Sequence, residues 1–283
     1  MLTVGIYTNL YKKNLAKVAK DLIKWFEEQN FSVLLPSDVA DSLSMPHLAA
    51  DLKDIVKTID IAVTLGGDGT LLNVAKQVAF YKIPILGINM GNLGFLTEIE
   101  LSDLYTDLAY LKTQNYNIDI RMMLDAHVYR GSKVLKRFLA LNDVVVTKGP
   151  FARLIRLKTY ASDSYIDTYP ADGIIISTPT GSTAYSLSAG GPIINPDMSL
   201  LLLTPICPHT LQSRSIILSE DDIIRVEFLA EHPEVLLTVD GQQGYKLQPG
   251  DQVIVKKSNL STRLIRLKKR SFYDVLRKKL REK

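Results

Sequence analysis

The sequence predicts two domains of different fold class: an α/β domain with a parallel, Rossmann-like sheet, then a β-rich, sandwich-like domain. Over the first hundred residues, short apolar runs alternate with stretches of helical periodicity, which is typical of a buried parallel sheet. After about residue 115 strand patterns follow one another with turns between them. The chain has 283 residues, 46% of them hydrophobic, which is enough for a core in each domain.

The elements of the first domain follow from these two periodicities. Continuous apolar runs predict strands that are buried on both faces, and these are expected at 2–7, 31–35, 61–65 and 84–88. Apolar residues three and four positions apart predict helices at 15–26, more weakly near 48–57, and at 71–79.

The second domain is predicted from a series of strands, with a helix at 101–114 leading into it. The strands are expected at 119–130, 134–147, 153–160, 165–177, 215–218, 223–229, 234–240 and 252–256. Apolar residues recur at helical spacing between Phe272 and Leu280, so a C-terminal helix is expected to pack back on the first domain. The predicted domains are therefore 1–100 with 270–283, and 101–269.

Charge and composition limit the classes of partner. The net charge is +4, and residues 263–283 hold ten Lys or Arg against two acidic residues. Such a tail can bind nucleic acid or membranes, but its apolar spacing favours a docked helix with a solvated basic face. We therefore expect no nucleic-acid partner and no membrane partner. A single cysteine, Cys207, and the absence of a charged leader predict a reducing cytoplasm.

The first candidate site is a glycine turn between a strand and a helix. The apolar strand ends in Gly66-Gly67-Asp68-Gly69-Thr70, and a helical stretch follows. Glycines bring backbone N–H groups close to a ligand, and the amino end of the helix favours an anion. The turn therefore predicts a phosphate site.

Asp68 is unexpected beside a phosphate, because two negative charges repel. The carboxylate makes sense if it accepts the proton of an attacking hydroxyl or helps to hold Mg²⁺. The alternative is an ordinary turn with Asp68 as a helix cap. The P-loop, dinucleotide-binding and protein-kinase motifs are absent from the sequence.

The second candidate site is a polar loop over residues 170–192. An apolar strand around Ile175 runs directly into a segment dense in hydroxyls and glycines. Such a segment builds little core, but its hydroxyl and backbone groups can converge on a polar ligand, and Tyr185 offers a face for a base. The alternative is a plain Ser/Thr/Gly surface loop.

These segments carry a resemblance to a known family. The glycine turn resembles that of a superfamily of NAD kinases, diacylglycerol and sphingosine kinases and, more distantly, phosphofructokinases. The 170–192 segment is similar to the NAD-binding signature of the NAD kinase family. Four further segments match in family order: Asn89-Met-Gly-Asn-Leu-Gly-Phe-Leu96, Ala140-Leu-Asn-Asp-Val144, Thr204-Pro-Ile-Cys-Pro-His-Thr-Leu211 and Val239-Asp-Gly-Gln242. By this resemblance the chain is identified as a bacterial-type member, dependent on ATP or polyphosphate.

The resemblance implies a role for each matching residue. Asp68 would activate the 2′-hydroxyl of the adenosine ribose of NAD, while Gly66, Gly67, Gly69 and Thr70 face the donor phosphates. Mg²⁺ or another divalent cation would arrive with those phosphates and could also contact Asp68. The implied NAD contacts are Asp68, Gly69, Phe95, Asn142, Asp143, Arg153, Asp172, Thr180, Thr183, Ala184, Tyr185, Ser186, Leu187, Ser188 and Gln242.

Within this set, Asn142 and Asp143 would bind the adenosine end and Asp172 the nicotinamide end of NAD, and the enzyme would be a homotetramer. Two departures stand out: Pro170 replaces a basic residue of many bacterial relatives, which leaves the use of NADH open, and Asp143 replaces Glu. The alternatives are a diacylglycerol-type lipid kinase and a non-catalytic NAD-binding sensor.

Overall fold

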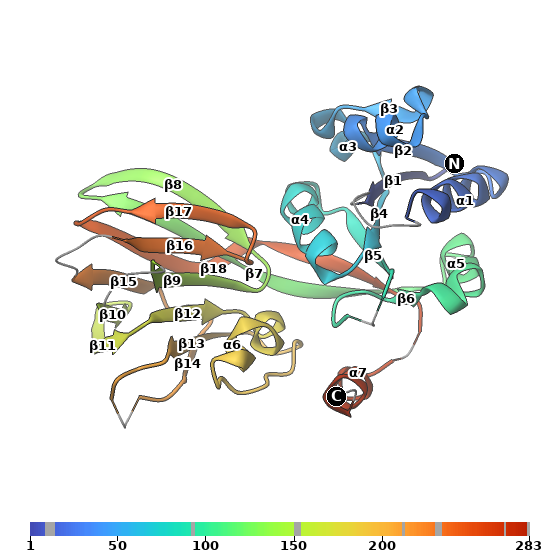
Figure 1. The fold of residues 1–283 in the computed structure, drawn as a ribbon. Helices are drawn as coiled ribbons and strands as arrows, with labels where there is room; N and C mark the ends of the chain where they lie inside the picture. Colours follow the sequence, from blue (N-terminus) through green and yellow to red (C-terminus); the bar gives the residue numbers. More distant parts are fainter. Residues whose placement is uncertain are drawn as a thin grey trace. The chain divides into compact units, whose positions relative to one another are not determined.

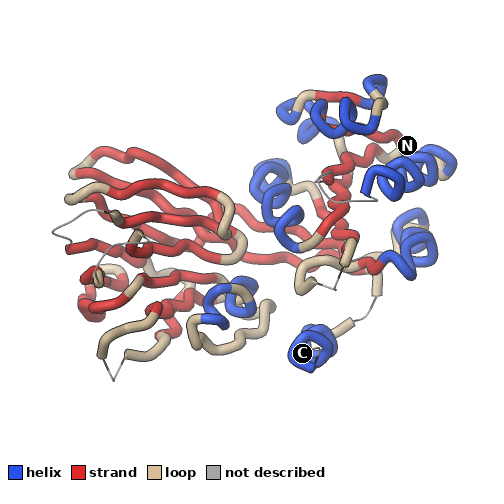
Figure 2. Tube along the Cα trace, in the orientation of Figure 1, coloured by secondary structure: helices blue, strands red, loops and turns tan. Residues whose placement is uncertain are grey.

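The computed structural model describes residues 1–8, 15–91, 94–149, 154–210, 213–229, 234–268 and 270–281. They form two compact units. Unit 1 comprises Met1–Ile120 and Thr262–Lys283, and unit 2 comprises Arg121–Ser261. Figure 2 shows that most helices belong to unit 1, whereas strands dominate unit 2. Two long strands, β7 (Asn117–Arg130) and β18 (Asp251–Arg266), contribute residues to both units.

Unit 1 is built on a parallel sheet with the order β3-β2-β1-β4-β5. Chain order reverses between β1 and β4, and ligands of such sheets bind beyond the carboxyl ends of the strands at this point. The predicted Rossmann-like sheet is confirmed. The strands are β1 (Thr3–Thr8), β2 (Ser32–Pro36), β3 (Ala49–Ala50), β4 (Ile61–Gly66), β5 (Pro84–Asn89) and β6 (Ile99–Glu100).

Helices cover this sheet on both faces. All residues of β4, and all residues of β5 except Pro84, are therefore buried. In Figure 1, α1 and α5 lie on one side of β1, β4 and β5, and α4 lies on the other. The helices are α1 (Leu15–Glu28), α2 (Ser37–Leu43), α3 (Leu52–Thr58), α4 (Asp68–Val78), α5 (Leu104–Lys112) and α7 (Phe272–Arg281), with 3₁₀ turns at Pro46–Leu48, Ala79–Tyr81 and Leu101–Asp103.

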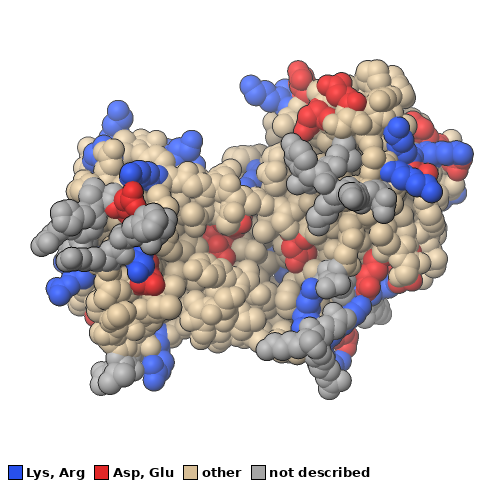
Figure 3. Space-filling view, viewed as in Figure 1, with Lys and Arg blue, Asp and Glu red and all other residues tan. Residues whose placement is uncertain are grey.

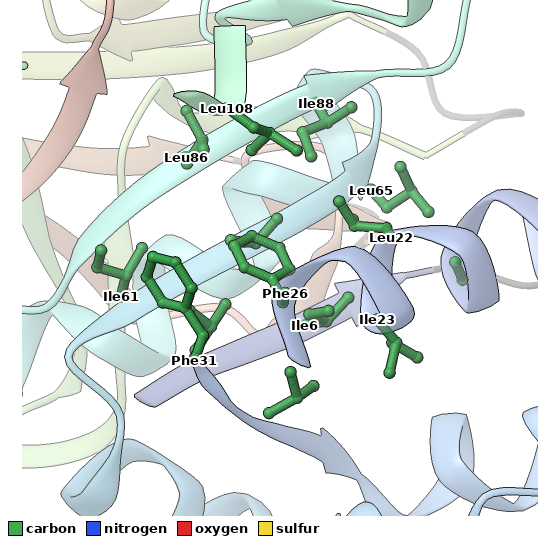
Figure 4. Packing of buried hydrophobic residues seen from close by; sticks show 14 of the residues in the cluster. Ile6, Leu22, Ile23, Phe26, Phe31, Ile61, Leu65, Leu86, Ile88 and Leu108 are labelled. Atoms are coloured by element: carbon green, nitrogen blue, oxygen red, sulfur yellow. The ribbon is translucent and has the colours of Figure 1, made fainter. Parts of the chain in front are cut away.

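The core of unit 1 lies between α1 and the sheet. Phe26 of α1 is fully buried, and its ring meets that of Phe31 edge to face at 5.3 Å between centroids. Figure 4 shows both rings among Ile6, Ile61 and Leu65 from the strands. The apolar stripe of α1 therefore packs on the sheet as its periodicity predicts.

The division of the chain differs from the predicted boundaries at 100/101 and 269/270. Helix α5 belongs to unit 1, because Leu104, Leu108 and Leu111 pack into that core. The end of β18 also belongs to unit 1, because Arg263 and Leu264 pair with β5. Nearby, the hydrogen bond from Lys268 to Asp107 raises the pKa of that lysine.

The C-terminal helix α7 packs on unit 1, as predicted. Ser271 caps it: its Oγ accepts the N–H of Asp274, whose carboxylate accepts the N–H of Ser271 in return. The ring of Phe272 lies 6.4 Å from that of Phe95, and Lys278 bonds Glu100. On the face drawn in Figure 3, Lys and Arg are interspersed with Asp and Glu. No described helix has the length and apolarity needed to span a bilayer.

Unit 2 is a sandwich of two sheets, as predicted. One has the order β14-β13-β12-β9-β16-β17, and the other joins β11, β10, β15, β18, β7 and β8. One buried cluster draws on both, with Val146 and Ile174 from the first and Leu157 and Val226 from the second. The remaining elements are β8 (Lys133–Ala140), β9 (Asp143–Lys148), β10 (Ile155–Ala161), β11 (Ser164–Ala171), β12 (Gly173–Ser177), β13 (Leu200–Ile206), β14 (Ile216–Ser219), β15 (Ile224–Leu229), β16 (Val235–Val239), β17 (Gln243–Leu247), a 3₁₀ turn at Thr180–Thr183 and α6 (Tyr185–Ser188).

Two strands predicted as continuous are each interrupted. The prediction of one strand over 134–147 was wrong, because β8 ends at Ala140 and β9 begins at Asp143 in the other sheet. The prediction over 165–177 was wrong in the same way, since β11 and β12 belong to different sheets and Asp172 lies between them. Strands β13 and β17 were missed. Each interruption contains a predicted NAD contact, Asn142 in the first and Asp172 in the second.

Candidate active site

The glycine turn lies at the carboxyl end of β4, beside the point where strand order reverses. Gly67 precedes α4 in an extended conformation, and its carbonyl accepts the N–H groups of Thr70 and Leu71. Asp68 is the first residue of the helix, and Gly69 is exposed. The turn therefore presents the amino end of an eleven-residue helix at the edge where this sheet type binds ligands.

The Asp68 carboxylate is held by a neighbouring loop. Its Oδ2 accepts the N–H of Phe95 at 2.8 Å, and its Oδ1 accepts those of Leu96 at 3.2 Å and Thr97 at 3.3 Å. A Cβ on Gly94 would overlap this carboxylate, so only glycine permits the close approach. The helix receives no side-chain cap. Asp68 therefore does not cap α4 with its side chain, contrary to the alternative interpretation of the turn.

In unit 2, Asp240 holds the turn that carries Asn142 and Asp143. One of its carboxylate oxygens accepts the N–H of Leu141 at 3.1 Å, and the other accepts those of Asn142 at 2.8 Å and Asp143 at 3.1 Å. Asp240 is buried and has a left-handed φ of 51°. The sequence gives no indication of this role of Asp240, because the turn lies almost a hundred residues away along the chain.

We expect Asp240→Asn to loosen this turn. The amide leaves one acceptor oxygen for three N–H groups, so unfolding of unit 2 should require about 1–3 kcal/mol less free energy. Urea denaturation measures this value, and hydrogen exchange at residues 141–143 should accelerate.

Asp222→Asn is the matched control, because Asp222 also accepts a backbone N–H, that of Ser219, but on the surface. If both variants unfold like the wild type and exchange at 141–143 is unchanged, Asp240 does not hold the turn.

Part of the hydroxyl-rich loop is used for its own structure. Thr178 Oγ1 donates to the Leu141 carbonyl at 2.6 Å and accepts the N–H of Gly181 at 3.0 Å. Ser182 Oγ donates to the Pro179 carbonyl, and Ser186 Oγ bonds Thr204 Oγ1. These hydroxyls are fully buried. They stabilise the loop rather than line its surface. The sequence alone does not distinguish hydroxyls that bond inside the loop from hydroxyls that could contact a ligand.

The other predicted residues of this loop are more accessible. Tyr185 is 44% exposed, Ser188 is exposed, and Thr183, Ala184 and Leu187 are partly buried. Thr180 is buried and its hydroxyl accepts a hydrogen bond from Arg121, itself buried, at 3.3 Å. The Tyr185 ring is therefore the largest surface that this segment offers to a flat ligand.

Asp172 pairs with a cation that the sequence did not indicate as part of the site. Lys148 Nζ lies 2.8 Å from its Oδ1, and the two side chains are 28% and 35% exposed. The register of β9 with β12 brings them together, since Thr147 is opposite Gly173. A positive charge thus lies beside Asp172, although position 170 is proline.

The remaining predicted residues are placed as follows. Phe95 is partly buried beside Phe272, and Gln242 is exposed in the turn between β16 and β17. Arg153 lies outside the described residues. The predicted site residues thus form two groups, one around Asp68 in unit 1 and one around Asn142 and Asp172 in unit 2.

Comparison with known proteins finds a matching family model for each of the two parts of the chain. The family model of the ATP-NAD kinase N-terminal domain matches residues 4–116, and that of the ATP-NAD kinase C-terminal domain matches residues 141–267. An NAD kinase of a Thermoanaerobacter species is 46% identical over all 283 residues and the whole of that protein. One of Moorella thermoacetica is 48% identical, covering 100% of this chain and 90% of the relative.

A solved structure has the same fold over the whole chain. The yeast NADH kinase complexed with NADH superposes with a TM-score of 0.89 and 27% identity, covering 100% of this chain and 87% of that one. The glycine turn at the carboxyl end of a Rossmann-like sheet is typical of a phosphotransferase, and here the α/β domain that carries it is joined to a β-sandwich domain. On the match of both domain models and the full-length relatives, the chain belongs to the NAD kinase family.

Proposed function

We propose that this protein transfers the terminal phosphoryl group of ATP, or of inorganic polyphosphate, to the 2′-hydroxyl of the adenosine ribose of NAD, which yields NADP. One observation carries the proposal: the Asp68 carboxylate is fixed by three N–H groups at the amino end of α4. A fixed carboxylate at an anion-binding turn suits a hydroxyl acceptor and a phosphate donor together. Family membership over both domains supports it and does not support the lipid-kinase alternative.

In the proposed reaction Asp68 orients the 2′-hydroxyl and accepts its proton. The hydroxyl oxygen forms a bond to the terminal phosphorus as the bond to the leaving phosphate breaks in line. Gly66, Gly67, Gly69 and Thr70 face the donor phosphates, because the turn brings their backbone to the amino end of α4. Most of the rate enhancement would come from positioning and charge neutralisation.

Unit 2 would bind NAD. The turn held by Asp240 presents Asn142 and Asp143 to the adenosine end, and the Tyr185 face accepts a base. Thr183, Ala184, Leu187 and Ser188 of the same loop would lie around it, Thr180 and Ser186 would support the loop from within, and Gln242, Phe95 and Arg153 would be further contacts. Asp172 would hold the nicotinamide end. Because Lys148 balances its charge, the site suits both a cationic and a neutral nicotinamide ring.

Magnesium would enter with the donor. Among the described residues, no three His, Cys, Asp or Glu side chains gather as a metal site, whereas Asp68 supplies one carboxylate at the turn. This fits Mg²⁺, which keeps several waters and binds one or two carboxylates plus substrate phosphates. When bound, Mg²⁺ neutralises the charge that develops on the transferring group.

We also propose that the protein is a cytoplasmic homotetramer. Both statements rest on family membership and, for the compartment, on the single cysteine of the chain. Light scattering of the purified protein measures the mass directly.

The proposed function predicts NADP from NAD, ATP and Mg²⁺. An NADP-specific dehydrogenase detects the product, and parallel reactions replace ATP by polyphosphate or NAD by NADH. A further reaction offers diacylglycerol in vesicles instead of NAD. Phosphorylated lipid without NADP would favour the lipid kinase. NAD binding without product from any donor would favour the sensor.

A further inference from the structure

A partly buried ion-pair network of Arg266, Glu98 and Asp119 contacts the loop that holds Asp68. Leu96 connects the two: its N–H donates to Asp68 Oδ1 at 3.2 Å, and its carbonyl accepts Arg266 Nη1 at 3.1 Å. The Leu96 carbonyl also shares a planar peptide unit with the N–H of Thr97, which donates to Asp68 Oδ1 at 3.3 Å. A shift of the guanidinium is therefore expected to move an N–H donor of the Asp68 carboxylate.

Arg266 is itself fixed on two sides. Its Nη1 donates to Glu98 Oε2 at 3.2 Å, and its Nε donates to Asp119 Oδ2 at 3.1 Å. The other oxygen of Glu98 accepts the N–H groups of Leu267 at 3.0 Å and Lys268 at 3.1 Å. The side chain of Glu98 is 7% exposed, and those of Arg266 and Asp119 are 19% exposed.

Burying these charges adds little net stability, because desolvation offsets most of the attraction between them. Their geometry is the more distinctive property. A planar guanidinium with three directed hydrogen bonds, one of them to a main-chain carbonyl, defines a position more sharply than apolar packing does. The loop 94–97 needs such definition, because all three donors to Asp68 come from it.

The network also ends on the two strands shared by the units. Arg266 is the last residue of β18, and Asp119 lies near the start of β7. The same two strands carry a second pair within unit 2, where Arg130 Nε donates to the buried Asp251 at 2.7 Å. That pair makes no described contact with the loop 94–97. It therefore offers an internal control for loss of an Arg–carboxylate pair alone.

We propose that Arg266 and Glu98 are positioning residues for phosphoryl transfer: through Leu96 they set the place of the Asp68 carboxylate. This inference rests on the proposed function, in which Asp68 receives the acceptor hydroxyl. Neither residue touches the reacting atoms. Their contribution lies in the geometry of the loop, which a displacement of about 1 Å is enough to spoil.

The test compares Arg266→Met, Arg266→Lys and Glu98→Gln with Arg130→Met in the full-length enzyme. We expect kcat of Arg266→Met to fall about tenfold to a hundredfold, with KM for NAD within about twofold of wild type, because positioning acts on the transition state. Arg266→Lys keeps the positive charge but loses the planar guanidinium with its several donors. Its kcat should therefore lie between those of the wild type and Arg266→Met. Arg130→Met should keep its kcat even where its unfolding temperature falls.

A second readout does not use activity. Hydrogen exchange of the amides of Phe95, Leu96 and Thr97 should accelerate in the Arg266 and Glu98 variants and stay slow in Arg130→Met. If the wild type forms no NADP, the proposed function fails, yet this exchange pattern still tests the network. The inference is overturned if Arg266→Lys and Glu98→Gln keep wild-type kcat and exchange, or if Arg130→Met loses kcat equally.

Discussion

Asp68→Asn should lower kcat at least about a hundredfold, the low end for removal of a positioned base, while NAD binding is retained. The amide has nearly the shape of the carboxylate but cannot accept a proton, and its NH₂ group faces the N–H donors of the loop 95–97. Steady-state formation of NADP measures kcat, and calorimetry measures the affinity for NAD.

Asp60→Asn is a matched control at the opposite end of β4, where the carboxylate accepts the N–H of Thr3 at 2.7 Å on the surface. It should leave kcat unchanged. Near-normal turnover in Asp68→Asn would exclude the base function, and a large loss of NAD affinity would assign Asp68 to binding instead.

Gly181→Ala should weaken NAD binding at least about tenfold, which corresponds to roughly 1.4 kcal/mol. A Cβ at this position would overlap the carbonyl of Asn142, whose oxygen also accepts the N–H of Thr178. The new Cβ would meet main-chain atoms, which cannot move aside as a flexible side chain can. The turn with Asn142 and Asp143 must therefore move away from the hydroxyl-rich loop. Calorimetric titration with NAD measures the loss.

Gly244→Ala controls for the loss of a glycine in the same unit, because a Cβ there meets only the Leu237 carbonyl at 3.9 Å. It should bind NAD like the wild type. Unchanged affinity in Gly181→Ala would show that the contact between loop and turn is not needed for binding.

The sequence predicted the sheet of unit 1 well because its strands are continuous apolar runs and α1 has one apolar stripe. In unit 2 the same signal failed at two places. Only the short pairs Asn142-Asp143 and Asp172-Gly173 separate the apolar residues on either side, so each pair of strands reads as one long strand although the chain changes sheets there. The turns there are stabilised by partners far along the chain, such as Asp240 for Asn142.

The site was predictable to a similar extent. The glycines of the turn and the unexpected carboxylate of Asp68 predicted this site, because the local geometry of an anion-binding turn requires glycine. The partners of Asp68 were not predictable, since Phe95 is 27 residues away and contributes a backbone N–H, which leaves no mark on residue type. The buried hydroxyls of Ser182 and Ser186 likewise resemble ligand contacts in sequence, although they bond inside the loop.

The position of the transferred phosphate on NAD tests the central claim most directly. Wild-type enzyme is incubated with NAD, ATP and Mg²⁺, and the product is examined by phosphorus–proton correlation NMR while released ADP is counted. The account predicts one new phosphate on the 2′-oxygen of the adenosine ribose for each ADP. A phosphate on the 3′-oxygen or on the nicotinamide ribose, or release of ADP without phosphorylated NAD, would contradict it.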